Sequence, residues 1–383
     1  MTEAFSAPRA EVVIDLAAIR HNVALLAGKA AESGAATMAV VKGDGYGHGA
    51  VPVARAALAA GATWLGGCSL AESLALREAG ITAPILSWLD TPDVDFAPGI
   101  AAGIDITASS RQELARIVKA ASATGSRARV HLKIDTGLCR NGCPNYEWPA
   151  LVTNAVEAAK MGVLDVVAIW SHFACADELG HPSIESQAKR FDDAYQVARD
   201  AGLSPLRHLA NSAATLTRPE FHYDLVRTGI AIYGLNPVPT DDDLRPAMTF
   251  RSAVVLLKRV RSGEAVSYGQ TWTAQRDTTL ALVPAGYADG VPRTLSGRMS
   301  VWLDGRRRPV VGRVCMDQLV VDCGDHEPAI GAEVVLFGQG TLGEPTAREW
   351  ADTLGTIDYE IVTGMYRPRV ARCYVGGAWE ECA

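Results

Sequence analysis

Residues 38–49 read MAVVKGDGYGHG and join a short apolar run to a glycine-rich turn, with Lys42 at the junction. The β-branched run is typical of an inner strand of a parallel sheet. The glycines let the backbone approach a ligand closely. A lysine that leaves a buried strand is poorly solvated and is well placed to be an amine nucleophile. The alternative is an ordinary strand-end lysine whose ammonium group reaches solvent, so Lys42 must be judged together with the rest of the chain.

Around this stretch, short apolar strands alternate with helical patterns over the first two thirds of the chain. This alternation is typical of βαβ units, and eight such strands predict a (β/α)₈, TIM-like barrel. The predicted strands are Met38–Val41, Thr63–Gly67, Pro84–Trp88, Ile104–Thr107, Arg129–Asp135, Asp165–Ser171, Leu206–Ala210 and Val226–Tyr233. Clear predicted helices are Leu16–Ala31 with Asp15 as its cap, Arg111–Ala123 with Ser110 as its cap, and Ile184–Ala201.

The pattern changes at residues 236–243, NPVPTDDD, a proline and acid cluster typical of a linker. Beyond it the chain is rich in short strands separated by Gly and Asp turns, which resembles a small β-barrel. We therefore expect a barrel domain over 1–240 and a smaller, mostly β domain over 241–383. The predicted strands of the second domain are Phe250–Val260, Thr278–Val283, Met299–Leu303, Pro309–Val314, Gln318–Asp322 and Glu333–Phe337.

Composition narrows the class of partner. The 383 residues are 48% hydrophobic and carry a net charge of −7, which argues against nucleic acid or an anionic membrane as the main partner, because both attract basic surfaces. A small ligand fits better. The sequence has no signal-peptide pattern and no apolar run long enough to span a membrane, so we expect a cytoplasmic protein. Its eight cysteines contain no CxxC pair, which favours reduced thiols and gives no reason to expect a metal site.

Polar residues gather where the predicted barrel strands end, which is where barrel enzymes carry their chemistry. They are Lys42, Asp135 to Arg140, His172, Asn211-Ser212 and Arg227 to Ile230. Each has a structural explanation by itself, such as a core histidine, a helix cap or half of an ion pair. Together, a lysine, an imidazole, a serine, a Thr-Gly-Ile turn and a tyrosine suit a phosphorylated aromatic aldehyde. Pyridoxal 5′-phosphate fits this description, with Lys42 forming a Schiff base and the phosphate near Ser212, Gly229 and Ile230.

These segments, with others along the chain, carry a resemblance to the alanine racemase family, whose members combine a barrel with a β domain and use pyridoxal 5′-phosphate. The similar segments follow one another in the family's order. They are Ala39–Lys42, Tyr46–Gly49, Leu132–Gly137, Ser171–Ala174, His208–Ala213, Arg227–Ile230, Val266–Gly269, Gly286–Gly290 and Val314–Asp317. The resemblance implies interconversion of L- and D-alanine, which supplies D-alanine for peptidoglycan.

The resemblance also implies two bases on opposite faces of Cα, because one residue cannot easily remove a proton from one face and return it to the other. Lys42 takes the proton of the D-enantiomer, and Tyr268 takes that of the L-enantiomer. A phenol has a free pKa of about 10, so it needs a cationic neighbourhood to act as a base near neutral pH. His208 and Arg227 match parts of that neighbourhood, and the arginine also faces the pyridine nitrogen of the cofactor, to which it can only donate.

The remaining residues match binding and supporting positions of the family. Arg140 and Met316 match substrate contacts, and Lys133 matches a lysine whose carbamate holds the arginine in place. Because Tyr268 and Met316 lie in the second domain and the family completes each site from the neighbouring subunit, a head-to-tail homodimer is implied. His172 matches the residue packed on the cofactor ring. Supporting positions are matched by Tyr287 and Asp317. Phosphate contacts are matched by Tyr46, Ser212, Gly229, Ile230 and Tyr366.

Departures from the family pattern leave the substrate range open. Gly43-Asp44 and Leu138-Cys139 stand where Ala-Asn and Met-Gly are common, and the register around Tyr366 is ambiguous. A broader amino acid or serine racemase is therefore the nearest alternative. A barrel-type decarboxylase would share the barrel and Lys42 without needing Tyr268. A non-catalytic protein that binds the cofactor would need only the barrel.

Overall fold

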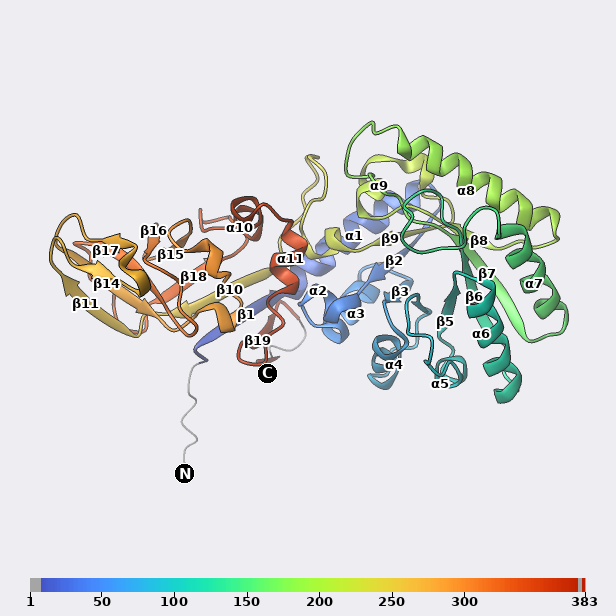
Figure 1. Ribbon diagram of the computed structural model, residues 1–383, viewed down its shortest axis with the longest axis horizontal. Coiled ribbons are helices and arrows are strands. Elements are labelled where there is room, and N and C mark those ends of the chain that lie inside the picture. The colour runs from blue at the N-terminus through green and yellow to red at the C-terminus, as the bar shows by residue number, and fades with distance from the viewer. Residues whose placement is uncertain (1–7, 378–380, 383) are drawn as a thin grey trace, which may run out of the picture. The chain divides into compact units, whose positions relative to one another are not determined.

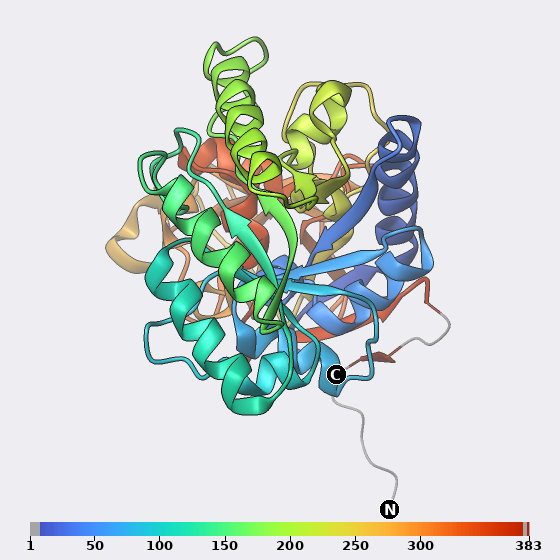
Figure 2. The same cartoon turned by 90° about the vertical axis from the view of Figure 1, so that its right-hand side faces the viewer.

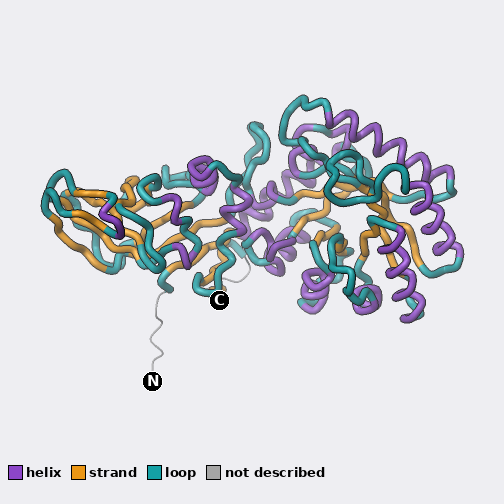
Figure 3. The backbone as a smooth tube through the Cα atoms, in the orientation of Figure 1, coloured by secondary structure: helices purple, strands orange, loops and turns teal. Residues whose placement is uncertain are grey.

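The computed structural model describes residues 8–377 and 381–382. By its internal contacts the chain divides into two compact units. The barrel unit comprises residues 19–45 and 49–244. The β unit comprises the described residues up to Ala18, the short segment Tyr46–His48, and the described residues from Arg245 onward. Helices predominate in the first of these units and strands in the second (Figure 3).

The barrel unit is built on a parallel sheet of eight strands in the order β8-β7-β6-β5-β4-β3-β2-β9 (Figures 1 and 2). β9 pairs with β2. Backbone bonds from Asp224 N to Arg207 O and from Arg227 N to Ala210 O join it to the β8 side and close the barrel. The predicted (β/α)₈ barrel is thus confirmed. Its strands are β2 (Ala36–Val40), β3 (Trp64–Gly67), β4 (Ile85–Ser87), β5 (Asp105–Ala108), β6 (Ala128–Lys133), β7 (Leu164–Trp170), β8 (Leu206–His208) and β9 (Leu225–Thr228).

Helices of the barrel unit surround these strands (Figure 2). Two predicted caps are confirmed. Asp15 Oδ1 accepts from the backbone N–H groups of Ala17 and Ala18, and Ser110 Oγ accepts from that of Glu113, so each satisfies donors that a helix start leaves unpaired. Helical elements between residues 16 and 221 include α1 (Leu16–Glu32), α3 (Ala50–Ala59), α4 (Leu70–Glu78), α5 (Ala97–Ala101), α6 (Arg111–Thr124), α7 (Trp148–Lys160), α8 (Ser183–Asp200), α9 (Ser212–Thr217) and the 3₁₀ turn η1 (Pro219–Phe221).

The last barrel strand is shorter than predicted. β9 ends at Thr228, and Ile230–Tyr233 form a 3₁₀ helix, η2, so the expectation of a strand through Tyr233 is wrong. Gly229 breaks the strand with φ −105° and ψ −99°, which lies outside the β region. All four residues of η2 are buried, and a short buried apolar run does not distinguish strand from helix by its pattern.

The β unit contains a ten-stranded sheet in the order β11-β14-β17-β16-β15-β18-β10-β1-β19-β20 (Figure 1). Its strand β1 (Ala10–Asp15) was not predicted, and it pairs antiparallel with β10 and parallel with β19. The expected strand Phe250–Val260 is two strands, β10 and β11. The strands are β10 (Met248–Ala253), β11 (Leu256–Val260), β14 (Thr278–Val283), β15 (Ser300–Leu303), β16 (Arg306–Val311), β17 (Leu319–Gly324), β18 (Glu333–Phe337), β19 (Ala371–Val375) and β20 (Glu381–Cys382).

Smaller elements complete the β unit. β12 (Ala265–Val266) and β13 (Trp272–Thr273) form a separate hairpin, and the mostly β character predicted for this part of the chain is confirmed. Its helical elements are η3 (Tyr268–Gln270), η4 (Tyr287–Asp289), η5 (Arg293–Leu295), α10 (Ala347–Leu354) and α11 (Asp358–Thr363).

Two further expectations from the sequence concern the cysteines and membrane spans. Cys373 on β19 is disulfide-bonded, so the expectation of reduced thiols is wrong for this cysteine. Within the described ranges, every helix is too short or too polar to cross a membrane.

Candidate active site

Lys42 lies two residues beyond the end of β2 and begins a turn of left-handed helix, α2 (Lys42–Tyr46). The φ angles of Gly43, Asp44, Gly45 and Tyr46 are 61°, 51°, 62° and 51°. L-residues disfavour this conformation, which explains glycine at two of the four positions. Asp44 Oδ1 accepts from Ala50 N at the start of α3, at 2.8 Å. The backbone after Lys42 therefore has an energetically unfavourable conformation that a hydrogen bond to α3 stabilises, and such strain is common at functional sites.

Glu72 on α4 anchors this turn, although the sequence did not identify it. Its Oε1 accepts from Gly43 N at 2.9 Å, and its Oε2 accepts from Cys68 N at 2.7 Å. Burial lowers the pKa of the Lys42 amine, and the charges of Arg140 and Arg227 lower it further, against the opposite effects of Cys68 and Glu72. A larger fraction of the Lys42 amine is therefore neutral and nucleophilic than in an exposed lysine.

Lys133, at the end of β6, is buried among cations. Burial, with Arg227 and Arg140 as further causes, lowers its pKa to about 7. Its Nζ lies 4.1 Å from the centroid of the Trp170 ring, which attracts a cation through its π face. Lys133 thus exists partly as a neutral amine at neutral pH.

Arg227 on β9 is a buried cation that contacts several polar groups of the barrel unit. Its guanidinium donates to Ser171 O at 2.8 Å and to Leu209 O at 3.1 Å, and contacts His172 Nδ1 at 3.2 Å and His208 Nδ1 at 3.1 Å. Burial lowers the pKa of Arg227 to about 9, so it stays charged at neutral pH. Burial, with Arg227 as the next cause, holds the pKa of His172 and His208 well below the usual histidine value, and both imidazoles are neutral.

A third histidine, His131, extends these contacts into the barrel. His208 Nε2 lies 2.9 Å from His131 Nδ1, and His131 Nε2 lies 3.0 Å from Asp105 Oδ2. Arg129 donates to both oxygens of Asp105. Because β6 and β8 are separated in the sheet by β7, a bond between their side chains runs through the barrel interior. The predictions for the site included His208 but missed Asp105 and His131.

Ser212 and the turn after β9 are joined by hydrogen bonds. Ser212 Oγ accepts from Gly229 N at 2.9 Å and from Ala231 N at 3.4 Å. The side chain of Asn211 caps α9 by accepting from Ala214 N, so Ser212 is the first residue of the helix and not its cap. This arrangement brings together the predicted residues Ser212, Gly229 and Ile230.

In the β unit, Tyr268 lies on a sharply constrained turn. Ser267, Gly269 and Gln270 have φ angles of 65°, 71° and 47°, and Ser267 Oγ donates to Arg313 O at 2.7 Å. The guanidinium of Arg313 would lie 3.0 Å from a Cβ on Gly269. The Tyr268 side chain is 70% exposed. A phenol this exposed on a turn this constrained contributes little to its own unit's core, which favours a role in binding or chemistry.

The segments that carry Tyr287 and Met316 also pack closely within the β unit. Tyr287 N donates to Cys315 O, and Ala288 N donates to Met316 O, each at 3.0 Å. A Cβ on Gly286 would lie 2.4 Å from either carbonyl oxygen, so only glycine permits this approach. The side chains of Tyr287 and Met316 are both exposed.

Arg369 ties Asp317 to a neighbouring carboxylate. Its guanidinium lies 2.7 Å from Asp317 Oδ1 and 3.4 Å from Asp289 Oδ1. The buried Asp289 accepts from Gly286 N at 2.9 Å. Through Arg369, Asp317 is therefore linked to the turn that carries Tyr287. Arg369 and Asp289 were not among the predicted site residues.

The last two predicted residues, Tyr46 and Tyr366, also belong to the β unit. The Tyr46 ring lies 6.2 Å from that of Tyr359, centroid to centroid. Tyr366 is exposed, with the Arg372 guanidinium 5.6 Å from its ring centroid.

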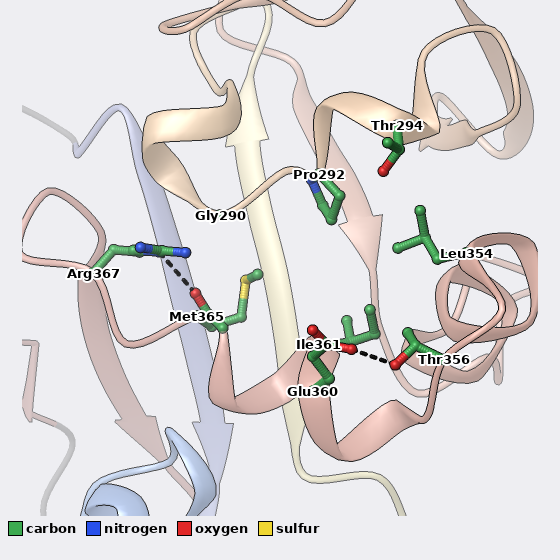
Figure 4. A pocket seen from close by; sticks show the side chains of 10 residues that line it. Gly290, Pro292, Thr294, Leu354, Thr356, Glu360, Ile361, Met365 and Arg367 are labelled. Atoms are coloured by element: carbon green, nitrogen blue, oxygen red, sulfur yellow. Dashed lines mark hydrogen bonds between the residues drawn. The ribbon is translucent and has the colours of Figure 1, made fainter.

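A pocket beside the segment that carries Tyr366 is shown in Figure 4, where the Thr356 hydroxyl donates to Glu360 and the Arg367 guanidinium donates to Gly364 O. Its lining comes from Gly290, Pro292, Thr294, Leu354, Thr356, Glu360, Ile361, Gly364, Met365 and Arg367.

The barrel unit thus gathers positive charge around Lys42. In addition to burial, the charges of Arg140 and Arg227 lower the pKa values of Lys42, Lys133 and His172. Positive charge gathered around a nucleophilic amine suits an anionic ligand that carries an aldehyde. His131 could have been found from the sequence, because residues two apart in a strand lie on the same face of the sheet and His131 is two residues from Lys133. Asp105, at the start of its strand, gave no comparable signal.

Comparisons with known proteins cover almost the whole chain. Residues 14–237 match the family described as alanine racemase, N-terminal domain, and residues 247–374 match alanine racemase, C-terminal domain. The chain is 55% identical to an alanine racemase of Salinispora arenicola, over 96% of this chain and 99% of that protein. It is 54% identical to an alanine racemase of Salinispora tropica, again over 96% of this chain and 99% of that protein.

A solved structure agrees with these sequence relatives. The crystal structure of alanine racemase from D-cycloserine producing Streptomyces lavendulae is 49% identical in sequence, with a TM-score of 0.94 over 97% of this chain and 98% of that one. Both units of the fold and both parts of the sequence therefore match the same family. The chain belongs to the alanine racemase family, a family of isomerases.

Proposed function

We propose that this protein interconverts L- and D-alanine with pyridoxal 5′-phosphate, using Lys42 and Tyr268 as bases on opposite faces of Cα. The observation that carries the proposal is the half-buried Lys42 amine, with its lowered pKa, beside the cations of the barrel unit, in a chain of this family. The cofactor supplies an aldehyde that binds an amine reversibly and a ring system that withdraws electrons from Cα. A cytoplasmic location and a supply of D-alanine for peptidoglycan are part of the same proposal.

The described residues fit such a cofactor. Lys42 is the proposed covalent anchor, because its lowered pKa favours the neutral amine that attacks an aldehyde. Arg227 is proposed to donate to the ring nitrogen, and a guanidinium can donate there but never accept. His172 is proposed to pack on the ring. The proposed phosphate contacts are Tyr46, Ser212, Gly229, Ile230 and Tyr366.

Two residues move the proton in this proposal. Lys42 removes it from D-alanine and returns it to that face, while Tyr268 does the same for L-alanine. Arg140 is proposed to bind the substrate carboxylate, for which the planar fork of an arginine is well suited, and Met316 is proposed to contact the substrate through its backbone. His208, Tyr287 and Asp317 are proposed as supporting residues.

Because Tyr268 and Met316 are exposed on the β unit, we propose that they act on the site of a second copy of the chain. A head-to-tail homodimer would then hold two sites, each with Lys42 from one subunit and Tyr268 from the other. A closed dimer of this kind makes each chain dependent on its partner for activity.

The reaction class can be tested by incubating the purified protein and cofactor with single amino acids in D₂O. We expect L- and D-alanine to acquire deuterium at Cα and to interconvert, with serine and larger amino acids much slower. Comparable turnover of serine would favour the broader racemase. Carbon dioxide release without inversion would favour a decarboxylase and contradict the proposal.

Lys133 is proposed to carry a carbamate that holds Arg140. Only the neutral amine adds CO₂, and with a pKa of about 7 its neutral fraction rises as the pH increases from 6 to 8. Under a fixed pressure of ¹³CO₂, a carbamate ¹³C signal is therefore expected to be stronger at pH 8 than at pH 6. The Lys133→Met variant should lack the signal, and a signal that survives in this variant would assign the carbamate to another amine.

A further inference from the structure

Three hydrogen bonds connect Arg227 to Asp105 through two histidines. The contacts run from Arg227 to His208 Nδ1 at 3.1 Å, from His208 Nε2 to His131 Nδ1 at 2.9 Å, and from His131 Nε2 to Asp105 Oδ2 at 3.0 Å. The side chains of Asp105, His131 and His208 have no exposed surface, and Arg227 is 5% exposed. We call Arg227, His208, His131 and Asp105, with the hydrogen bonds between them, the row. Loss of one of its buried hydrogen bonds would leave a polar atom unpaired, which costs about 1–3 kcal/mol.

The chemistry of the two ends permits one arrangement of protons. A guanidinium has only donors, so His208 Nδ1 must accept and His208 Nε2 must carry the hydrogen. His131 Nδ1 then accepts from His208, and the hydrogen of His131 lies on Nε2, where it meets the carboxylate of Asp105. A proton on His208 Nδ1 would place two donors face to face at 3.1 Å. Burial beside Arg227 disfavours a doubly protonated His208.

We propose that Asp105 and His131 are positioning residues, which orient Arg227 by fixing both imidazoles in the Nε2–H tautomer. Arg129 holds the carboxylate in place through a bond to each oxygen, at 2.6 and 3.1 Å. With His208 Nδ1 as a permanent acceptor, one nitrogen of Arg227 is committed to this row. Its NH2 group is committed to the carbonyls of Ser171 and Leu209.

The consequence concerns the proposed cofactor contact and rests on the proposed function. Arg227 must present its donor to the ring nitrogen in a fixed direction, and the row of bonds removes the rotation of the guanidinium that would spoil it. Trp170 supports the same orientation, because it stacks on His208 at 5.4 Å between ring centroids and lies 4.8 Å from Arg227 Cζ. Asp105 thus influences the site from β5, two side chains away from Arg227.

The tautomers can be measured directly in the unmodified protein. Two-bond ¹H–¹⁵N spectra of histidine-labelled protein separate Nε2–H, Nδ1–H and doubly protonated rings, and His131→Gln and His208→Gln assign the two signals. We expect both rings as Nε2–H, with and without the cofactor. An Nδ1–H or doubly protonated His208 would overturn the inference without any Asp105 variant.

A matched pair of variants distinguishes the effect of the hydrogen-bond acceptor at Asp105 from the effect of its negative charge. Asp105→Asn can keep an oxygen facing His131, whereas Asp105→Leu, of similar size, removes the acceptor, and both lose the charge. Only the leucine variant is expected to show mixed His208 tautomers and a kcat lowered by up to about 10²-fold with a smaller change in KM, since misplaced catalytic groups cost about this much. Equal loss in both variants, or in neither, would overturn the proposal.

His222→Gln is the control for removing a buried histidine. His222 bonds to Ser33 and to Thr215 O, and lies outside the row, so the His208 signal should not change in this variant. The spectra also keep the two proposals distinct. If the unmodified protein fails to racemise alanine, the proposed function fails, whereas the tautomers report on the row of bonds alone.

Discussion

Lys42→Ala is expected to abolish racemisation, with kcat lowered by more than about 10⁴-fold, because it removes the proposed covalent anchor and one of the two bases together. Binding of the cofactor should become noncovalent. Reduction with borohydride followed by peptide mass analysis should label position 42 in the unmodified protein and leave the variant unlabelled.

Lys119→Ala is the matched control, because Lys119 is an exposed lysine on α6. It should keep both the label at position 42 and the rate. If Lys42→Ala retained the rate, Lys42 could not be a base. If the label appeared on another lysine of the unmodified protein, Lys42 could not be the anchor.

Tyr268→Phe is expected to separate the two faces of Cα. Without the phenolic hydroxyl, proton removal from L-alanine should slow by about 10²–10⁴-fold, the usual contribution of a general base. Lys42 should still exchange the Cα proton of D-alanine with D₂O, so D-alanine should gain deuterium without inverting. The absorbance of the bound cofactor should be unchanged. Equal slowing of exchange from both enantiomers would remove Tyr268 from its proposed role.

Mixing the two variants tests whether a site takes Lys42 and Tyr268 from different chains. Random reassortment of Lys42→Ala and Tyr268→Phe subunits should restore about one quarter of the unmodified activity, because half of the dimers are mixed and each mixed dimer has one intact site. If both residues of a site came from one chain, mixing would restore nothing.

The fold of the barrel unit could be predicted because each of its strands is a short apolar run between turn signals. The last strand was overextended, since the buried run Ile230–Tyr233 has the same pattern in a strand and in a 3₁₀ helix. Strand β1 was missed for another reason. Its partners, β10 and β19, lie hundreds of residues away in the sequence, and local patterns do not report such pairings.

The candidate site was predictable where a residue's chemistry is unusual for its place in the chain. Lys42 and Arg227 follow or occupy barrel strands, where a charged side chain requires an explanation. Asp105 begins a strand after a turn, where an aspartate is ordinary, and its significance depends on contacts with His131 and Arg129 from another strand. Trp170 was absent from the predicted site because a tryptophan in a barrel strand is typical of a core.

The left-handed turn after Lys42 has a consequence for stereochemistry within the polypeptide itself. Over Gly43 to Tyr46 the backbone follows the mirror image of an ordinary helix, which is the conformation that D-amino acids prefer. Each L-residue there costs about 1–2 kcal/mol, while a D-residue at position 43 would match the backbone without that cost. A protein proposed to invert alanine therefore holds its reactive lysine at the edge of a turn whose own handedness is inverted.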